Sequence, residues 1–466
     1  MIFDRNAAAR LAEKYESFYL YDENAILDSI EKLRKNFDGV RFLYSAKANP
    51  HPGVLNCILS EGIGVDAASL REVQMARENG LGKRDIYYSA PGKSLHDIDA
   101  ALEACIIIAD SVNEVERIQA LAAGHGIVAE IGVRINPNFT FDGAVGTANK
   151  FGIDEDTVFQ KLTDWKAMKN IKITGIHVHS RSQELDGRLI AGYYAKMFEL
   201  ACRVQDALGE ELKFVNMGSG IGIPYAESDS PVDLVTLGAE MTRLMDVYRS
   251  RLSAQVLIET GRFLVGKAGV YVTHVLDKKL SHGKTFVILA NTLNGFVRPS
   301  IAQMVESYTD AELPHNCEPM YTGRNAFGFV PLKDPAETET VTVVGNLCTG
   351  TDVIAKDITL PKLDCGDVFV ITNAGSYAAV LSPMQFASLT PPAQVLLKAD
   401  GSTVIDRYNI KQKAFLIFRQ KSLFLANILL IICICVIKYL IMHNCAFAPI
   451  FAWSTDEIFK EVQTKN

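Results

Sequence analysis

One lysine stands at the end of a short apolar run, where a side chain can face a pocket. The stretch RFLYSAKANPHPG (residues 41–53) places Lys47 between β-forming residues and an Asn-Pro pair that breaks regular structure. A lysine in such a place is commonly a solvated strand end. It can also form a Schiff base with an aldehyde once its ammonium is desolvated and its pKa is lowered. The rest of the chain has to decide between these interpretations.

A glycine-rich stretch, NMGSGIGIPY (216–225), could bind an anion. Its glycines leave backbone N–H groups free to close around a phosphate, and a serine hydroxyl could add a donor. Taken alone, the stretch is more often an ordinary glycine-rich loop. Arg262, in the later motif ETGR, would be a charged partner for the same phosphate. The loop residues concerned are Gly218, Ser219, Gly220 and Gly222.

Two further ionisable residues indicate which kind of cofactor would carry the phosphate. Glu259 lies just before Arg262 and could keep a pyridine nitrogen protonated, which makes the ring a strong electron sink. His177 could stack on a ring face, and a hydrogen-bonded structural histidine is an equally good interpretation. A lysine, a phosphate-binding loop and an acid together suggest pyridoxal phosphate. An acid beside the ring nitrogen favours loss of CO2, whereas an arginine there would favour reversible proton transfer.

These residues need a scaffold that brings distant parts of the chain together. From residue 41 the sequence alternates eight short apolar or β-branched runs with amphipathic helical patterns. Runs that are apolar on both faces and joined by helices favour parallel pairing. The expected strands are 41–46, 62–67, 85–90, 105–110, 127–136, 171–179, 213–218 and 255–260.

Eight such units predict an α/β fold, a (β/α)8 TIM barrel whose active site lies at the carboxyl ends of the strands. A doubly wound sheet is the alternative, but the glycine fingerprint expected after its first strand is absent from the sequence. Polar and small residues gather at the predicted strand ends, as an active-site rim requires. They are Lys47, Asp66, Ser89, Asp110, Arg134, His177, Ser180, Gly218 to Gly222, Glu259 and Arg262.

Near residue 268 the helical patterns give way to alternating strands and turn signals, which predict a second, mostly antiparallel β domain. The expected organisation is a barrel over residues 24–267 and a β domain formed by residues 1–23 and 268–405. A tail follows over residues 406–466.

The tail differs from the body in hydropathy. Residues 423–442 are apolar apart from Asn427 and Lys438, and the segment is long enough to cross a bilayer. A basic flank would then hold the body on the cytoplasmic side. The alternative is an extension that does not belong to the working protein.

Net charge and cysteine spacing indicate which classes of partner and metal site are not expected. The net charge of −7 over 466 residues argues against nucleic acid. Nine cysteines in no metal-finger spacing, with no signal peptide, predict a cytoplasmic protein without a metal site.

The motifs occur in an order that resembles a known family. YSAKAN, GVDAAS, HVHS, NMGSGIGIPY, ETGR, CTGTD and NAGSY follow one another as in the fold-type III pyridoxal-phosphate decarboxylases, which include diaminopimelate and ornithine decarboxylases. The resemblance covers about residues 5 to 400. It implies a barrel and a β domain to which the N-terminal segment contributes a strand. It also implies a homodimer whose active sites are completed across the interface.

The resemblance further implies roles for single residues. Lys47 would carry the cofactor, with a lowered pKa, and Glu259 would pair with the pyridine nitrogen. His177 would stack on the ring. Cys348, from the other subunit, would donate a proton after CO2 leaves, and Tyr377 would contact the phosphate from the β domain. The remaining cofactor residues would be Asp66, Arg134, Ser180, Gly218, Gly220, Gly222 and Arg262.

Departures from the family pattern bear on the substrate. His179 stands where the family usually has glycine and could crowd the site or touch the substrate, and Ser219 replaces a glycine. Thr349 replaces an acid that would meet a distal ammonium, a charge-assisted contact that contributes about 1.5–3 kcal/mol. Arg298 matches an arginine that can bind a carboxylate. These residues argue against a free diamino acid and favour an amino-acid derivative, including a carrier-protein-bound aminoacyl group.

The expected activity is the removal of the α-carboxyl group of an amino acid or derivative in biosynthetic metabolism. A racemase on the same barrel is one alternative, and Glu259 argues against it because racemases place arginine near the pyridine nitrogen. A non-catalytic cofactor-binding regulator is another. Retention of both Lys47 and Cys348 argues against a regulator.

Overall fold

The computed structural model describes residues 3–406, apart from 142, 144, 219, 312, 314–316 and 335–336. The predicted donor Ser219 and the apolar segment 423–442 therefore lie outside the described residues. Among the helices that the structure describes, none is long and apolar enough to cross a bilayer. Membrane contact through the tail stays a prediction.

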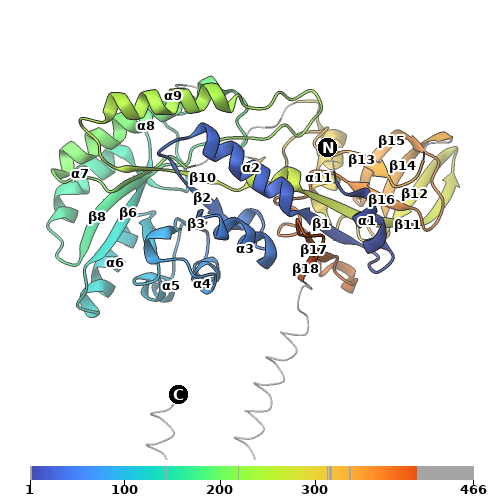
Figure 1. Cartoon of the computed structure of the whole chain (residues 1–466), viewed down its shortest axis with the longest axis horizontal. Coiled ribbons are helices and arrows are strands. Elements are labelled where there is room, and N and C mark those ends of the chain that lie inside the picture. The colour runs from blue at the N-terminus through green and yellow to red at the C-terminus, as the bar shows by residue number, and fades with distance from the viewer. Residues whose placement is uncertain are drawn as a thin grey trace, which may run out of the picture. The chain divides into compact units, whose positions relative to one another are not determined.

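A parallel sheet closes into a barrel in the part of the chain drawn at the left of Figure 1. The described residues contribute nine strands to this sheet, and eight of them form the barrel, which closes through the pairing of β10 with β2 and of β5 with β6. The ninth, the two-residue β7 (Ile153–Asp154), pairs with the end of β6. The predicted (β/α)8 barrel is confirmed. Its strands are β2 (Arg41–Ser45), β3 (Gly64–Ala67), β4 (Ile86–Tyr88), β5 (Ile106–Ala109), β6 (Ala129–Asn136), β8 (Ile171–His177), β9 (Phe214–Asn216) and β10 (Gln255–Thr260).

Helices surround the barrel, and short polar caps start several of them directly after a strand. Ser69, Ser94 and Ser111 each accept the N–H of the residue three positions on, which satisfies a free donor at the helix start. The loops after β3 and β5 are therefore short, whereas the loop from β4 to α5 spans residues 89–94. The helices are α2 (Glu23–Asn36), α3 (Pro52–Ser60), α4 (Leu70–Glu78), α5 (Leu95–Ala101), α6 (Val112–Gly124), α7 (Glu155–Lys166), α8 (Gly187–Leu208), α9 (Leu234–Tyr248) and α10 (Arg262–Val265).

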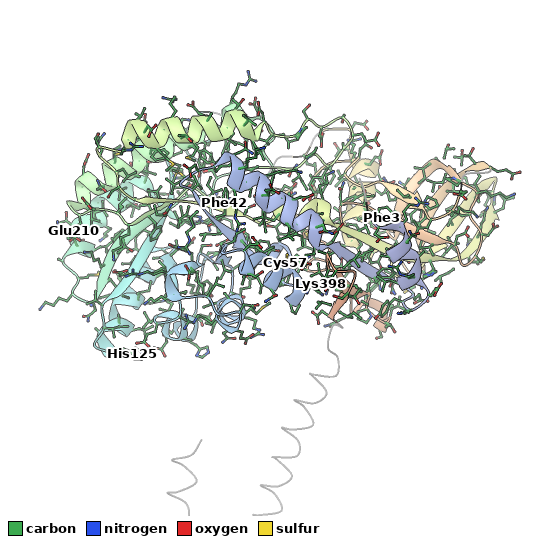
Figure 2. All side chains as sticks on the ribbon, in the orientation of Figure 1. Phe3, Phe42, Cys57, His125, Glu210 and Lys398 are labelled. Carbon is green, nitrogen blue, oxygen red and sulfur yellow. The ribbon has the colours of Figure 1, made fainter. Side chains whose placement is uncertain are left out.

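The barrel interior is filled with side chains. The ring of Phe214 fills the space beside two glycines of neighbouring strands, since a Cβ on Gly132 or Gly175 would lie 2.8 or 2.5 Å from that ring. Outside the barrel, Phe42, which is labelled in Figure 2, points toward α2. Its ring packs edge-on against that of Phe37 at the end of α2, with ring centroids 5.8 Å apart. A filled interior leaves the carboxyl-end rim as the place for a site.

The remaining strands form a second, mostly antiparallel sheet. β1 (Phe18–Asp22) belongs to it, because it pairs antiparallel with β11 (Gly269–Ser281) and parallel with β17 (Ala393–Leu397). The N-terminal segment therefore contributes a strand, as the resemblance implies, while the exact domain limits stay a prediction. The other strands are β12 (Lys284–Leu289), β13 (Phe329–Pro331), β14 (Thr338–Gly345), β15 (Val353–Pro361), β16 (Val368–Ile371) and β18 (Thr403–Asp406), with the helices α1 (Arg5–Ala12) and α11 (Val297–Tyr308) alongside.

Candidate active site

Lys47 lies in a single turn of 3₁₀ helix (Ala46–Ala48) directly after β2. Its Nζ donates to Oδ2 of Asp66, at 3.1 Å, on the adjacent strand β3. The lysine side chain is 42% exposed, whereas the carboxylate is fully buried. A fixed negative charge therefore holds a partly accessible ammonium at the rim.

Asp66 gathers several donors around one carboxylate. The hydroxyl of Ser45 donates to Oδ2 at 3.1 Å, and the hydroxyl of Ser89 donates to Oδ1. These contacts fix the orientation of the carboxylate beside Lys47. The sequence alone points to Asp66 and Ser89 as strand-end residues but does not single out Ser45.

The charge environment of Lys47 differs from the prediction. Burial by itself would lower the pKa of this ammonium, but Asp66, Tyr377 and Glu259 outweigh burial and raise the pKa above its ordinary value. The predicted lowering of the lysine pKa is therefore wrong for the protein without cofactor. Covalent attachment to an aldehyde then needs a nearby proton acceptor, because only the neutral amine is nucleophilic.

Glu259 ends β10 as a buried, charged carboxylate. Its Oε1 accepts the amide N–H of Asn216 at 3.0 Å and lies 3.0 Å from Nε2 of His177. Burial would raise its pKa, but His177 and Lys47 lower it well below the ordinary range of a carboxyl group. An ionised carboxylate in this position can hold a proton on a nearby ring nitrogen.

The two histidines of HVHS occupy different environments. His177 ends β8 and is 1% exposed behind the rim, against Glu259. His179 lines a cavity of about 490 Å³ together with Arg134 and Ser180, and its Nε2 lies 3.1 Å from Oγ of Ser182. Burial lowers the pKa of His179 to about 3, so its imidazole is neutral at physiological pH.

The loop after β9 needs glycine at two of the predicted positions. At Gly218, φ is +67° and a Cβ would lie 2.3 Å from the carbonyl oxygen of Val178. At Gly222 a Cβ would lie 2.9 Å from the carbonyl oxygen of Glu184. The N–H groups of Gly218 and Gly222 donate to Asn216 and Glu184, so these bonds fix the loop shape.

The guanidinium groups of Arg262 and Arg298 both contact the hydroxyl of one tyrosine. Arg262 is predicted to bind the phosphate, and Arg298 the substrate. Nη1 of Arg262 and Nη1 of Arg298 lie 3.4 and 3.5 Å from the hydroxyl of Tyr225. Burial would raise the pKa of Tyr225, but the two guanidinium groups lower it below its ordinary value. Arg262 also pairs with Glu318, whose carboxylate lines the cavity beside His179. Tyr225 is not among the site residues predicted from the sequence, although it is the last residue of the glycine-rich stretch.

The β domain meets the barrel at the lysine. The backbone N–H of Tyr377 donates to the carbonyl of Ala48 at 2.9 Å, and the amide of Asn49 donates to the carbonyl of Gly375 at 2.9 Å. The ring of Tyr377 also lies 5.3 Å from the guanidinium of Arg262. Tyr377 is thus placed between the predicted lysine and the predicted phosphate arginine.

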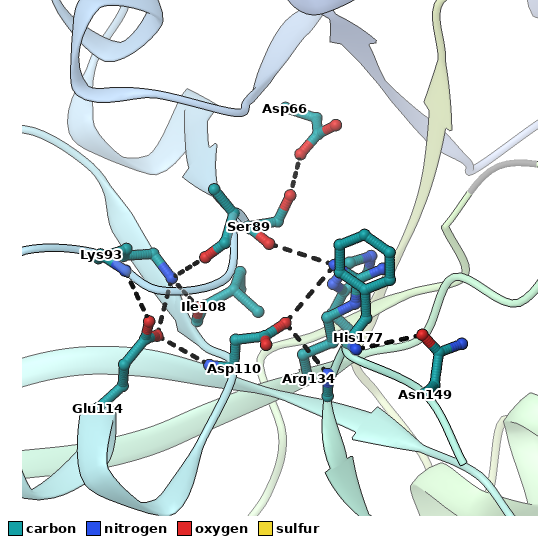
Figure 3. Close-up of polar contacts among 12 residues, drawn as sticks. Asp66, Ser89, Lys93, Ile108, Asp110, Glu114, Arg134, Asn149 and His177 are labelled. Atoms are coloured by element: carbon teal, nitrogen blue, oxygen red, sulfur yellow. Dashed lines mark hydrogen bonds and ion pairs between the residues drawn. The ribbon is translucent and has the colours of Figure 1, made fainter. Parts of the chain in front are cut away.

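Arg134 reaches the rim from β6. Its Nη1 lies 3.4 Å from the carbonyl oxygen of Ser89 and 3.6 Å from Oδ1 of Asp110 (Figure 3). Its guanidinium also lies over the ring of Phe151, 4.5 Å from the ring centroid. These contacts connect the carboxyl ends of the neighbouring strands β4, β5 and β6.

Cys348 and Thr349 lie apart from the rim. They belong to the turn between β14 and β15, at the right of Figure 1, and the side chain of Cys348 is exposed. Ser180, after β8, is also exposed, but it lines the cavity beside His179 and Arg134. The structure of one chain therefore brings most of the predicted site together and leaves the predicted proton donor outside it.

The residues at the rim fit pyridoxal phosphate part by part. Lys47 offers an accessible amine for an aldehyde, and buried Glu259 offers a charge for a ring nitrogen. The N–H groups of Gly218 and Gly222 already donate within the protein, so a phosphate would be held by the fixed backbone at Gly220 and by the guanidinium of Arg262. When bound, the cofactor supplies an electron sink for the carbanion that decarboxylation leaves.

Comparisons with known proteins agree with this geometry. Residues 23–266 match the family model described as pyridoxal-dependent decarboxylase, pyridoxal binding domain. A decarboxylase of L-glutamyl-BtrI acyl-carrier protein from Niallia circulans is 29% identical, over 86% of this chain and 93% of the relative. Diaminopimelate decarboxylase from Thermoplasma acidophilum is 30% identical, over 85% of this chain and 91% of that protein.

Solved structures show the same fold. The crystal structure of diaminopimelate decarboxylase from Helicobacter pylori complexed with L-lysine has a TM-score of 0.72 and 27% identity, and the match covers 85% of this chain and 95% of that one. The barrel, its rim and the relatives together show that this chain belongs to the pyridoxal-dependent decarboxylase family and is a pyridoxal-phosphate-dependent amino-acid decarboxylase.

Proposed function

We propose that the chain removes the α-carboxyl group of an aminoacyl substrate that carries no free distal ammonium, with Lys47 as the cofactor lysine. One observation supports this most directly. Lys47 and the ionised Glu259 lie at the ends of the paired strands β2 and β10, so an amine and a ring-nitrogen partner face one rim. The roles below extend that arrangement.

Asp66 would accept the proton that Lys47 has to lose before its amine can react. Its Oδ2, 3.1 Å from Nζ, is the acceptor to which the ammonium already donates, so it can take the proton that leaves when the amine attacks an aldehyde. Ser45 and Ser89 keep the carboxylate aligned during this step.

His179 suits the ring-facing role better than His177. The neutral imidazole of His179 lines the cavity, whereas His177 is enclosed and lies against Glu259. We therefore assign to His179 the stacking on the cofactor ring, and to His177 the support of Glu259. An uncharged ring face avoids placing a positive charge against a pyridinium.

The substrate would be held by its carboxylate and could be attached to a carrier. Arg298 is 1% exposed and donates to the carbonyl of Ser376 at 3.3 Å, so its guanidinium is fixed in place. Thr349, on the turn between β14 and β15, would supply a neutral hydroxyl and no charge for a distal ammonium. The relative that acts on a carrier-bound L-glutamyl group makes an aminoacyl carrier protein a reasonable first candidate.

Cys348 would act in a second copy of the chain. An exposed thiol on the β14–β15 turn is available to a partner subunit, so the proposed homodimer would place one chain's Cys348 in the other chain's site.

A substrate panel tests the proposal. Free amino acids, and acidic amino acids joined to carrier proteins through the side-chain carboxyl with the α-carboxyl free, are scored for CO2 release and, separately, for loss of optical activity. CO2 release from an amino acid that is joined to a carrier through its side-chain carboxyl, so that its α-carboxyl is free, supports the proposal if Lys47→Ala abolishes it. CO2 release confined to free diamino acids, or racemisation without CO2, contradicts it.

A further inference from the structure

A buried ion pair lies beneath the rim, outside the residues assigned so far. Nζ of Lys93 and Oε2 of Glu114 are 2.9 Å apart, and the two side chains are 0% and 2% exposed. Lys93 follows β4, and Glu114 lies in the first turn of α6. Removing two charges from water costs roughly several kcal/mol per ion, so such a pair persists only when further hydrogen bonds satisfy it.

The further hydrogen bonds all go to the backbone of the strand ends. Nζ of Lys93 also donates to the carbonyl oxygens of Ala90, at 2.6 Å, and Ile108, at 2.7 Å. The carboxylate of Glu114 accepts the N–H groups of Lys93 and Asp110, each at 2.9 Å. The pair therefore ties the loop after β4 to the end of β5.

These two segments contain Ser89 and Asp110, which contact the site residues Asp66 and Arg134 (Figure 3). Ser89 precedes Ala90 in the first segment; its carbonyl oxygen faces Arg134 and its hydroxyl donates to Asp66. Asp110 in the second segment faces Arg134 and accepts the N–H of Gly152 at 3.1 Å. A shift of either segment would move Arg134 or Asp66.

We propose that Lys93 and Glu114 are positioning residues for the cofactor site. They fix Ser89 and Asp110, and through them the directions in which Arg134 and Asp66 point. The inference rests on the proposed role of Lys47, because Asp66 acts on the cofactor through that lysine. A merely structural pair would instead change stability and leave cofactor binding unchanged once the protein is folded.

The double variant Lys93→Met with Glu114→Gln tests this inference. It removes both charges, so no unpaired buried charge remains, and Gln keeps one acceptor for the backbone. We expect the dissociation constant for pyridoxal phosphate, measured by absorbance titration of the apoprotein, to rise about 10- to 100-fold. The reason is that displacing the binding residues by even a fraction of an ångström weakens their contacts with the cofactor. The matched control is Lys278→Met with Glu339→Gln, a part-buried pair in the β domain whose loss should leave that constant unchanged.

Ser89→Ala keeps the test informative if the double variant does not fold. It leaves the ion pair intact and removes the contact with Asp66, so cofactor affinity should again fall, with wild-type circular dichroism. Unchanged affinity in a folded double variant, unchanged affinity in Ser89→Ala, or an equal loss in the control would overturn the inference. If the wild type itself bound no cofactor, the proposed function would fail instead.

Discussion

Replacing Glu259 by glutamine isolates the charge of one buried carboxylate. Glutamine has nearly the same shape and can still accept from Asn216, so the variant loses the negative charge that strengthens this hydrogen bond and that faces Nε2 of His177 at 3.0 Å. A hydrogen bond to a charged group contributes about 1.5–3 kcal/mol. At 4% exposure, solvent does little to reduce this figure. The apoprotein should therefore lose about 1.5–3 kcal/mol of unfolding free energy at pH 7.

The pH dependence gives the sharper test. Because the pKa of Glu259 is lowered in the folded chain, its stabilisation is present above the ordinary carboxyl pKa of about 4.3 and is lost as the pH falls toward the lowered value. The difference between the wild type and Glu259→Gln, measured by urea unfolding, should therefore shrink at pH values below about 4.

The exposed Glu337→Gln is the matched control, and it should change stability by less than about 0.5 kcal/mol. A Glu259→Gln difference that stays constant from pH 7 to pH 3 would refute the reasoning, because it would show that shape, not charge, causes the loss.

Three other predictions concern the site shared by two subunits, the histidine that faces the cofactor ring and the C-terminal tail. Mixing inactive Lys47→Ala and Cys348→Ala chains should restore about a quarter of wild-type activity, since half of the dimers then hold one intact shared site; no recovery would exclude the shared site. His179→Ala should alter the absorption of the bound cofactor, whereas a change only with His177→Ala would return the stacking role to that residue. Full-length protein should enter the membrane fraction and a chain truncated to residues 1–405 should not, if the tail is an anchor; equal partitioning would exclude the anchor.

The barrel could be predicted because its signal is local and repeated. Runs that are apolar on both faces alternate with amphipathic helices, and each expected run contains an observed strand. Most of the strands are shorter than expected: β9 covers Phe214–Asn216 instead of 213–218, and β4 covers Ile86–Tyr88 instead of 85–90, whereas β10 has the expected bounds. Their last residues leave the ladder to form the rim, which period-two patterns cannot show.

The pKa of Lys47 could not be predicted, because its sign depends on strand register. β2 lies between β3 and β10, with Ser45 opposite Asp66 and Leu43 opposite Glu259. This register places two carboxylates beside one ammonium, and their combined charge outweighs burial. A strand-end lysine in the sequence carries no information about that distance.

The partners of the arginines are another feature beyond the sequence. Arg298 lies in α11, far along the chain from Tyr225, and only the docking of the β domain brings them together. The buried Lys93–Glu114 pair gives no sequence signal either, because each residue has the character of an ordinary surface residue at a helix start or in a loop.

The absorption spectrum of the purified protein tests the central claim most directly. With pyridoxal phosphate added, the wild type should show a near-visible band distinct from that of the free cofactor, and Lys47→Ala should show only the free cofactor. Asp66→Asn, which removes the proton acceptor but keeps the lysine, should slow the appearance of the band. A wild-type protein that stays colourless after cofactor is added, or a Lys47→Ala variant with the wild-type band, would contradict the account.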